Sequence, residues 1–129
     1  MSIETGLKGR AELVVAYENT AAAVGSGLVP VFATPSMIAL MEQAAASSLL
    51  PYLEDGQGSV GIRLDVSHEA ATPIGMKVWA ESEVTEVNGK QITFAVAAYD
   101  EAGLIGRGTH KRACINVERF MSKVEQKKA

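Results

Sequence analysis

The sequence of 129 residues has one cysteine, two histidines and few aromatic side chains, which make up 5% of the chain. Cys114 has no second cysteine with which to form an intramolecular disulfide, and we expect it to be a small buried residue. Two histidines and one cysteine far apart in the chain are too few for a zinc site. We therefore predict no metal and no cofactor, and a core built from aliphatic residues, alanine and glycine.

The chain also has no excess of basic charge and no long apolar run. Its formal net charge is −3, which gives no general attraction to nucleic acid. No stretch of 18 apolar residues could span a membrane, and the N-terminus lacks a basic segment followed by an apolar one. We expect a cytoplasmic protein without a nucleic-acid or membrane partner, and we expect the basic run from Lys123 to Lys128 to be a solvated tail.

The composition supports a folded protein, because 47% of the residues are hydrophobic and 21% are charged. We predict a single domain over residues 1–129. The strongest helix signal runs from Pro35 to about Leu50, with Thr34 at the N-cap and Pro51 at the end. Small and apolar side chains recur at helical spacing, which predicts a buried helix; they are Met37, Leu40, Met41, Ala44, Ala45, Ser48 and Leu49.

Strand patterns surround this helix. We predict strands over residues 11–17, 60–67, 76–87, 91–99 and 104–117, and an irregular flap or loop over residues 18–30. Asn88-Gly89 is a strong hairpin signal between two of these strands. One short strand, one helix and four further strands give an α+β order. An antiparallel β-sheet wrapped around a long central helix, the hotdog fold, is the simplest arrangement that buries all of these elements.

Two polar residues interrupt the apolar pattern. Counting by two from Val60 places His68 on the apolar face of its strand, and Glu42 lies within the helix that we expect to be buried. Taken alone, His68 is compatible with a hydrogen-bonded core histidine, Glu42 with an exposed stripe of the helix, and Thr34 with a helix cap. Each is also a candidate for acid–base chemistry at a groove.

Several short segments, taken together in order and spacing, resemble the bacterial fluoroacetyl-CoA thioesterase family. The resemblance covers roughly residues 30–128. The segments are Val31-Phe32-Ala33-Thr34, Met41-Glu42, Pro51-Tyr52-Leu53-Glu54, Gly58-Ser59-Val60-Gly61, Val66-Ser67-His68-Glu69-Ala70-Ala71-Thr72-Pro73, Gly106-Arg107-Gly108-Thr109-His110-Lys111-Arg112-Ala113 and Val117-Glu118-Arg119-Phe120.

The resemblance implies an acyl-CoA thioesterase that hydrolyses the thioester to a carboxylate and free coenzyme A. Its catalytic threonine, glutamate and histidine fall on Thr34, Glu42 and His68, and a glycine beside the thioester falls on Gly61. Residues eight apart on a helix are separated by about 12 Å along its axis. A homodimer, or a dimer of dimers, with its site at the subunit interface would let Thr34 and Glu42 meet His68 across chains.

We expect Phe32 and Leu28 to contribute to substrate binding. Leu28 takes the place of the family's gate phenylalanine, and the short segment over residues 20–29 has no aromatic residue. This departure predicts a broader or different acyl group from fluoroacetyl. On the last strand, Lys111 and Arg112 could contact the phosphates of coenzyme A, or could be exposed charges that protect a sheet edge.

Two other functions fit the same fold. A hotdog hydratase or dehydratase would share the acyl-CoA groove and use its acid–base pair to add or remove water. A binding module would hold an acyl thioester or another small ligand without catalysis, and it would have no need of a buried Glu42. The combination of Thr34, Glu42 and His68 favours hydrolysis.

Overall fold

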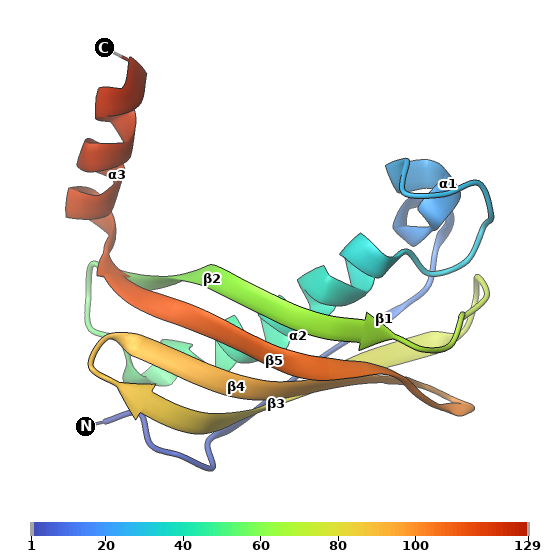
Figure 1. Cartoon of the computed structure of the whole chain (residues 1–129), viewed down its shortest axis with the longest axis horizontal. Helices are drawn as coiled ribbons and strands as arrows, with labels where there is room; N and C mark the ends of the chain where they lie inside the picture. The colour runs from blue at the N-terminus through green and yellow to red at the C-terminus, as the bar shows by residue number, and fades with distance from the viewer. Residues whose placement is uncertain (1, 129) are drawn as a thin grey trace.

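A computed structural model describes residues 2–128 of the chain. Five strands form one antiparallel sheet in the order β1-β3-β4-β5-β2, and a long helix, α2, lies across one face of it (Figure 1). The elements are β1 (Lys8–Val14), η1 (Tyr17–Asn19), α1 (Ala21–Val24), α2 (Thr34–Leu49), η2 (Leu50–Tyr52), β2 (Gln57–His68), β3 (Lys77–Asn88), β4 (Gln91–Asp100), β5 (Gly103–Asn116), α3 (Val117–Glu125) and η3 (Gln126–Lys128).

The predicted architecture is confirmed. The central helix begins and ends one residue earlier than the sequence predicted, and the four strands that follow it match the expected ranges to within three residues at each end. Gly89 turns the β3–β4 hairpin with a positive φ of 62°, a conformation that glycine adopts without steric cost. The apolar side of α2 and the inner faces of β3 and β4 supply most of the core, which is aliphatic apart from Phe32 and Phe94.

The central helix is not buried all round. It packs mainly over β1 and β3, and its opposite side, which includes Ala39, Gln43 and Ser47, is exposed. On the packed side, Gly9 of β1 is needed because a Cβ atom there would collide with the Ala44 carbonyl of the helix. The helix is thus held closest to β1 and β3, and it reaches β5 and β2 through side chains such as Glu42.

A β-bulge in β2 changes which residues of this strand face the helix. Gly61 pairs with Arg112 and Arg63 pairs with Lys111, so Ile62 is an extra residue in β2. The alternation counted from Val60 through Ile62 is therefore wrong, and Ile62 is 47% exposed. Beyond the bulge the count resumes correctly, and His68 shares the inner face with Leu64 and Val66.

The first strand, predicted over residues 11–17, is shifted toward the N-terminus, because β1 spans Lys8–Val14 and Tyr17 begins η1. Two further segments contain helical turns that the sequence did not predict. The C-terminal basic run from Lys123 to Lys128 is solvated, as predicted, but it is helical: it forms the end of α3 and the turn η3, and α3 stands away from the sheet beyond β5 (Figure 1). Asn116 caps this helix by accepting a hydrogen bond from the Arg119 amide at 2.9 Å. The predicted flap over residues 18–30 contains η1 and the single helical turn α1, whose cap Thr20 is completely buried.

Candidate active site

The first candidate group is the pair formed by Thr34 and His68. Thr34 Oγ1 lies 2.7 Å from His68 Nδ1, which joins the start of α2 to the end of β2. Thr34 is the first residue of the helix, and its hydroxyl makes no capping bond, so the predicted N-cap role is wrong. Its side chain contacts the histidine instead.

The environment of His68 favours the neutral ring. Burial lowers the pKa of His68, and the backbone of Ala70 acts in the opposite direction with a smaller effect. Its Nε2 atom is buried and has no hydrogen-bond partner among residues 2–128. A neutral imidazole in contact with a hydroxyl can accept a proton from it, which is the geometry of an activated oxygen nucleophile or a polarised donor.

The Thr34–His68 pair lies in a cleft of about 300 Å³ under the flap. Phe32 lies next to it, fully buried, at the point where the flap joins α2. The flap is tied to the body by backbone bonds, including Phe32 N–H to the Thr72 carbonyl at 2.8 Å. The cleft is lined by Ala21, Ser26, Val31, Phe32, Thr34, His68, Glu69, Ala70 and Ala71.

The second candidate group surrounds Glu42, two turns further along α2. Arg112 Nη1 donates to Glu42 Oε2 at 3.2 Å, and the side chains of Glu42 and Arg112 are 37% and 9% exposed. Arg112 also donates from Nε to Ser59 Oγ at 2.9 Å and from Nη2 to the Ser59 carbonyl at 3.0 Å. Arg112 is not an exposed edge charge, because β5 is an interior strand and the guanidinium is engaged by Glu42 and Ser59. A contact of Arg112 with coenzyme A stays a prediction.

Gly61 allows these groups to approach each other. A Cβ atom at Gly61 would overlap Glu42 Oε2 and would lie 3.2 Å from His110 Cε1. The backbone of Gly61 has no positive φ, so the requirement here is space and not backbone conformation. The glycine predicted beside the substrate is thus placed directly against the Glu42 carboxylate.

Sequence reasoning missed Ser59 and His110, which complete the second group. His110 is fully buried, and its Nε2 lies 3.2 Å from Arg112 Nη1 and 3.9 Å from Glu42 Oε2. The available signal was their spacing. Ser59 stands two residues before Gly61 on β2, and His110 stands two residues before Arg112 on β5; alternate residues of a strand share a face.

The two groups stay apart within one chain. Thr34 meets His68 in the same chain, which corrects the expectation that this contact forms between chains. No contact joins Glu42 to His68 among the described residues. Leu28, expected near the substrate, is 96% exposed at the outer side of the flap.

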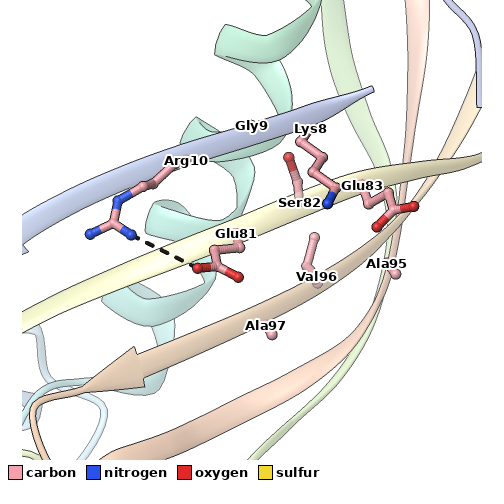
Figure 2. Close-up of a pocket in the computed structure, with 9 residues that line it drawn as sticks. All are labelled: Lys8, Gly9, Arg10, Glu81, Ser82, Glu83, Ala95, Val96 and Ala97. Atoms are coloured by element: carbon pink, nitrogen blue, oxygen red, sulfur yellow. Dashed lines mark ion pairs between the residues drawn. The ribbon is translucent and has the colours of Figure 1, made fainter. Parts of the chain in front are cut away.

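A separate hollow of about 520 Å³ lies over β1, β3 and β4 and does not include the candidate catalytic residues (Figure 2). It is bordered by the Arg10–Glu81 ion pair at 3.8 Å and floored by small side chains. Ser82 reaches its inner side, but no nucleophile with an adjacent base lines this hollow. In residues 2–128, no helix has the length and apolar character needed to cross a membrane.

Comparison with known proteins gives a consistent result. The model of the family described as FlK, fluoroacetyl-CoA-specific thioesterase, matches residues 15–118. The fluoroacetyl-CoA thioesterase of Streptantibioticus cattleyicolor is 46% identical over 97 residues, which cover 75% of this chain and 70% of that protein.

Solved structures agree with this match. A structure of the fluoroacetyl-CoA thioesterase FlK has a TM-score of 0.94 at 37% identity, with 98% of both chains covered. A thioesterase superfamily member from Thermus thermophilus has a TM-score of 0.90 at 30% identity, covering 98% of this chain and 94% of that one. The fold and the site thus define a hotdog-fold thioesterase. Within that class, the chain belongs to the fluoroacetyl-CoA-specific thioesterase family.

Proposed function

We propose that this protein hydrolyses an acyl-CoA thioester at a site shared by two subunits. The observation that carries the proposal is the 2.7 Å contact between Thr34 Oγ1 and His68 Nδ1 at the start of α2. The contact sits in a cleft under a flap, where an acyl group could lie. Family membership supports the same reaction.

The proposed roles follow from the geometry. The lowered pKa of His68 favours the neutral ring, which takes up the proton lost by the water molecule that the reaction consumes, directly or by way of Glu42, and gives it to the departing sulfur. Thr34 presents its hydroxyl to the carbonyl, beside the first amides of α2, which favour developing negative charge. Glu42 supplies the carboxylate that attacks the carbonyl or deprotonates a water molecule.

A homodimer would bring the two groups together. β2 is the edge strand of the sheet, and its outer side pairs with no strand in residues 2–128. A two-fold axis near Leu64 and Asp65, midway between Gly61 and His68 along β2, would pair this edge with its copy in antiparallel orientation. Gly61 and Glu42 of one subunit would then lie beside Thr34 and His68 of the other.

Helix α3 gives independent support for a dimer. It extends past the β2 edge of the sheet (Figure 1), and a helix this short gains little stability without packing. Three apolar residues, Val117, Met121 and Val124, are 42%, 43% and 39% exposed at spacings of four and three, so they form one stripe. A second copy on the β2 edge would cover this stripe.

The proposed substrate is an acyl-CoA with an acyl group other than, or in addition to, fluoroacetyl. The flap over residues 20–29 contains alanine, glycine and valine but no aromatic residue. Leu28, which replaces the family's gate phenylalanine, is nearly fully exposed and places no bulky ring over the cleft. Residues 1–129 as one domain, and a cytoplasmic location, remain predictions of the sequence.

The test is thiol release from a panel of acyl-CoAs, from short to aryl and including fluoroacetyl-CoA. We expect turnover on at least one, reduced about 100-fold or more by Thr34→Ala, His68→Ala or Glu42→Gln. The matched control for Glu42→Gln is Glu86→Gln, which removes an exposed charge on β3 and should leave turnover unchanged. Binding of acyl-CoA without any thiol release would contradict the proposal and support a binding module.

A further inference from the structure

His110 is a completely buried histidine to which the proposed thioester chemistry assigns no role. It lies on β5 beneath α2, with its ring stacked on Phe94 at a centroid distance of 5.9 Å. Its Nδ1 lies 2.9 Å from the Arg63 carbonyl oxygen, and its Nε2 lies 3.2 Å from Arg112 Nη1. Both ring nitrogens are therefore engaged.

These two partners determine the protonation of the ring. The Arg63 carbonyl can only accept a hydrogen bond, so Nδ1 must carry the proton. The Arg112 guanidinium can only donate, so Nε2 must offer its lone pair. Burial, the largest influence, lowers the pKa of His110, which agrees with a neutral ring.

Arg112 is in turn fixed on several sides. Its Nη1 donates both to His110 Nε2 and to Glu42 Oε2, each at 3.2 Å. The other side of the guanidinium is held by the hydroxyl and the carbonyl of Ser59. His110 and Ser59 therefore set the plane of the guanidinium, and that plane sets the position of the Glu42 carboxylate.

We propose that His110 is a positioning residue for thioester hydrolysis, which acts through Arg112 to orient the Glu42 carboxylate. The inference rests on the proposed function, because it gives Glu42 a role in the reaction. A proton on Nε2 would remove the acceptor and place a cation against Arg112. Besides Arg112, the groups around His110 are the Glu42 carboxylate from α2, the Arg63 carbonyl from β2 and the Phe94 ring from β4.

Two conservative variants separate the two hydrogen bonds of the ring. In His110→Asn the amide nitrogen can replace Nδ1 and donate to the Arg63 carbonyl, but nothing replaces the acceptor for Arg112. In His110→Gln the longer side chain can present its oxygen near the Nε2 position and accept from Arg112.

We expect kcat to fall about 10- to 100-fold in His110→Asn with KM changed less than about twofold, because only the placement of a reacting group is lost. We expect His110→Gln to stay within about fivefold of wild-type kcat. Equal losses of kcat in both variants, in proportion to a fall in Tm, would overturn the proposal and assign His110 a packing role only.

A double-mutant cycle with Glu42→Gln tests the route through Glu42. If His110 acts through that carboxylate, His110→Asn should change kcat of the Glu42→Gln enzyme by less than about twofold. Independent, multiplying losses would overturn the positioning role and leave the proposed function intact. Wild-type activity in Glu42→Gln would instead contradict the proposed role of Glu42.

Ser59→Ala keeps the test decisive if both His110 variants fail to fold. It removes one acceptor of Arg112 at a half-buried position and leaves the buried ring in place. We expect a smaller fall in kcat, about threefold, with KM and Tm unchanged and no further loss in the Glu42→Gln background. A Ser59→Ala enzyme with wild-type kcat would overturn the proposal.

Discussion

The two groups of candidate residues are carried by the same elements, α2 and the strands beside it, but they are built in different ways. Thr34 and His68 share one hydrogen bond, stand at the mouth of a cleft, and leave His68 Nε2 without a partner in the described residues. Glu42 lies in a network in which Arg112 makes four hydrogen bonds to three residues.

This difference corresponds to two needs of a hydrolase. A group that moves a proton must be able to change its bonding during the reaction, and a sparse environment permits that. A carboxylate that must be aimed at a small target gains from a rigid support. Because neither group contains all the residues of the reaction, the comparison predicts that one subunit is an incomplete enzyme.

Subunit complementation is the strongest test of whether the two groups act together across subunits. His68→Ala and Glu42→Gln should each lose activity about 100-fold or more. When the two variants are unfolded together and refolded, mixed dimers should contain one intact site of two, restoring about a quarter of wild-type turnover. The measurement is thiol release against mixing ratio. No recovery, with mixed dimers demonstrated by mass spectrometry, would show that Glu42 and His68 act within one chain.

The substitution Gly61→Ala disturbs the group around Glu42 and leaves the Thr34–His68 pair unchanged. The added methyl would overlap Glu42 Oε2, so the carboxylate must move away from Arg112. We expect kcat to fall about 10- to 100-fold with the fold retained, as monitored by circular dichroism. Gly58→Ala, on the same strand and against the side chain of Val117, is the matched control and should lose less than threefold. Equal losses in both would contradict the role given to Gly61.

The pH dependence of kcat/KM tests the role of the Thr34–His68 pair. Burial lowers the pKa of His68, so the neutral, active form persists below the usual histidine range. Activity should be level near neutrality and should fall about tenfold per pH unit once the pH drops below that lowered pKa. An acid limb that begins above the usual pKa of histidine would contradict this assignment.

The smallest effect is expected at the interface, where Met121→Glu places a charge in the exposed stripe of α3. Dimers should weaken, and specific activity should fall severalfold at low protein concentration but recover at high concentration. Sedimentation velocity measures the dimer fraction. Ser122→Glu adds the same charge at the next, exposed position and should leave the dimer intact; equal weakening by both would argue against docking of the stripe.

The sequence predicted the elements better than the site. Helical spacing and turn residues located α2 and the β3–β4 hairpin, because these signals depend on neighbours within a few residues. Helix α3 was missed, because alternating charges in a short terminal segment resemble a solvated tail. Val117, Met121 and Val124 were recognised as one stripe only from the structure, in which all three are exposed on this helix.

The candidate site was predicted as a set of residues but not as an arrangement. Thr34, Glu42 and His68 were identified from local motifs. Such motifs indicate which residues take part, but not how far apart the residues lie in the folded chain. That Arg112 is buried depends on β5 lying between β4 and β2, which is a property of the whole sheet. Strand alternation places Ser59 on the face of Gly61 and His110 on the face of Arg112, but only their contacts with Arg112 show that they belong to the site.

The bulge at Ile62 also matters for anyone who aligns, grafts or redesigns this strand. Gly61 and His68 are seven positions apart, an odd number, and a regular strand would turn them to opposite sides. They share a side only because Ile62 takes no place in the pairing with β5. Deletion of Ile62 would reduce this separation to six, an even number, so a regular strand would keep Gly61 and His68 on the same side. A redesign that keeps Ile62 but draws it into the pairing would instead turn Ser59 and Gly61 away from the helix.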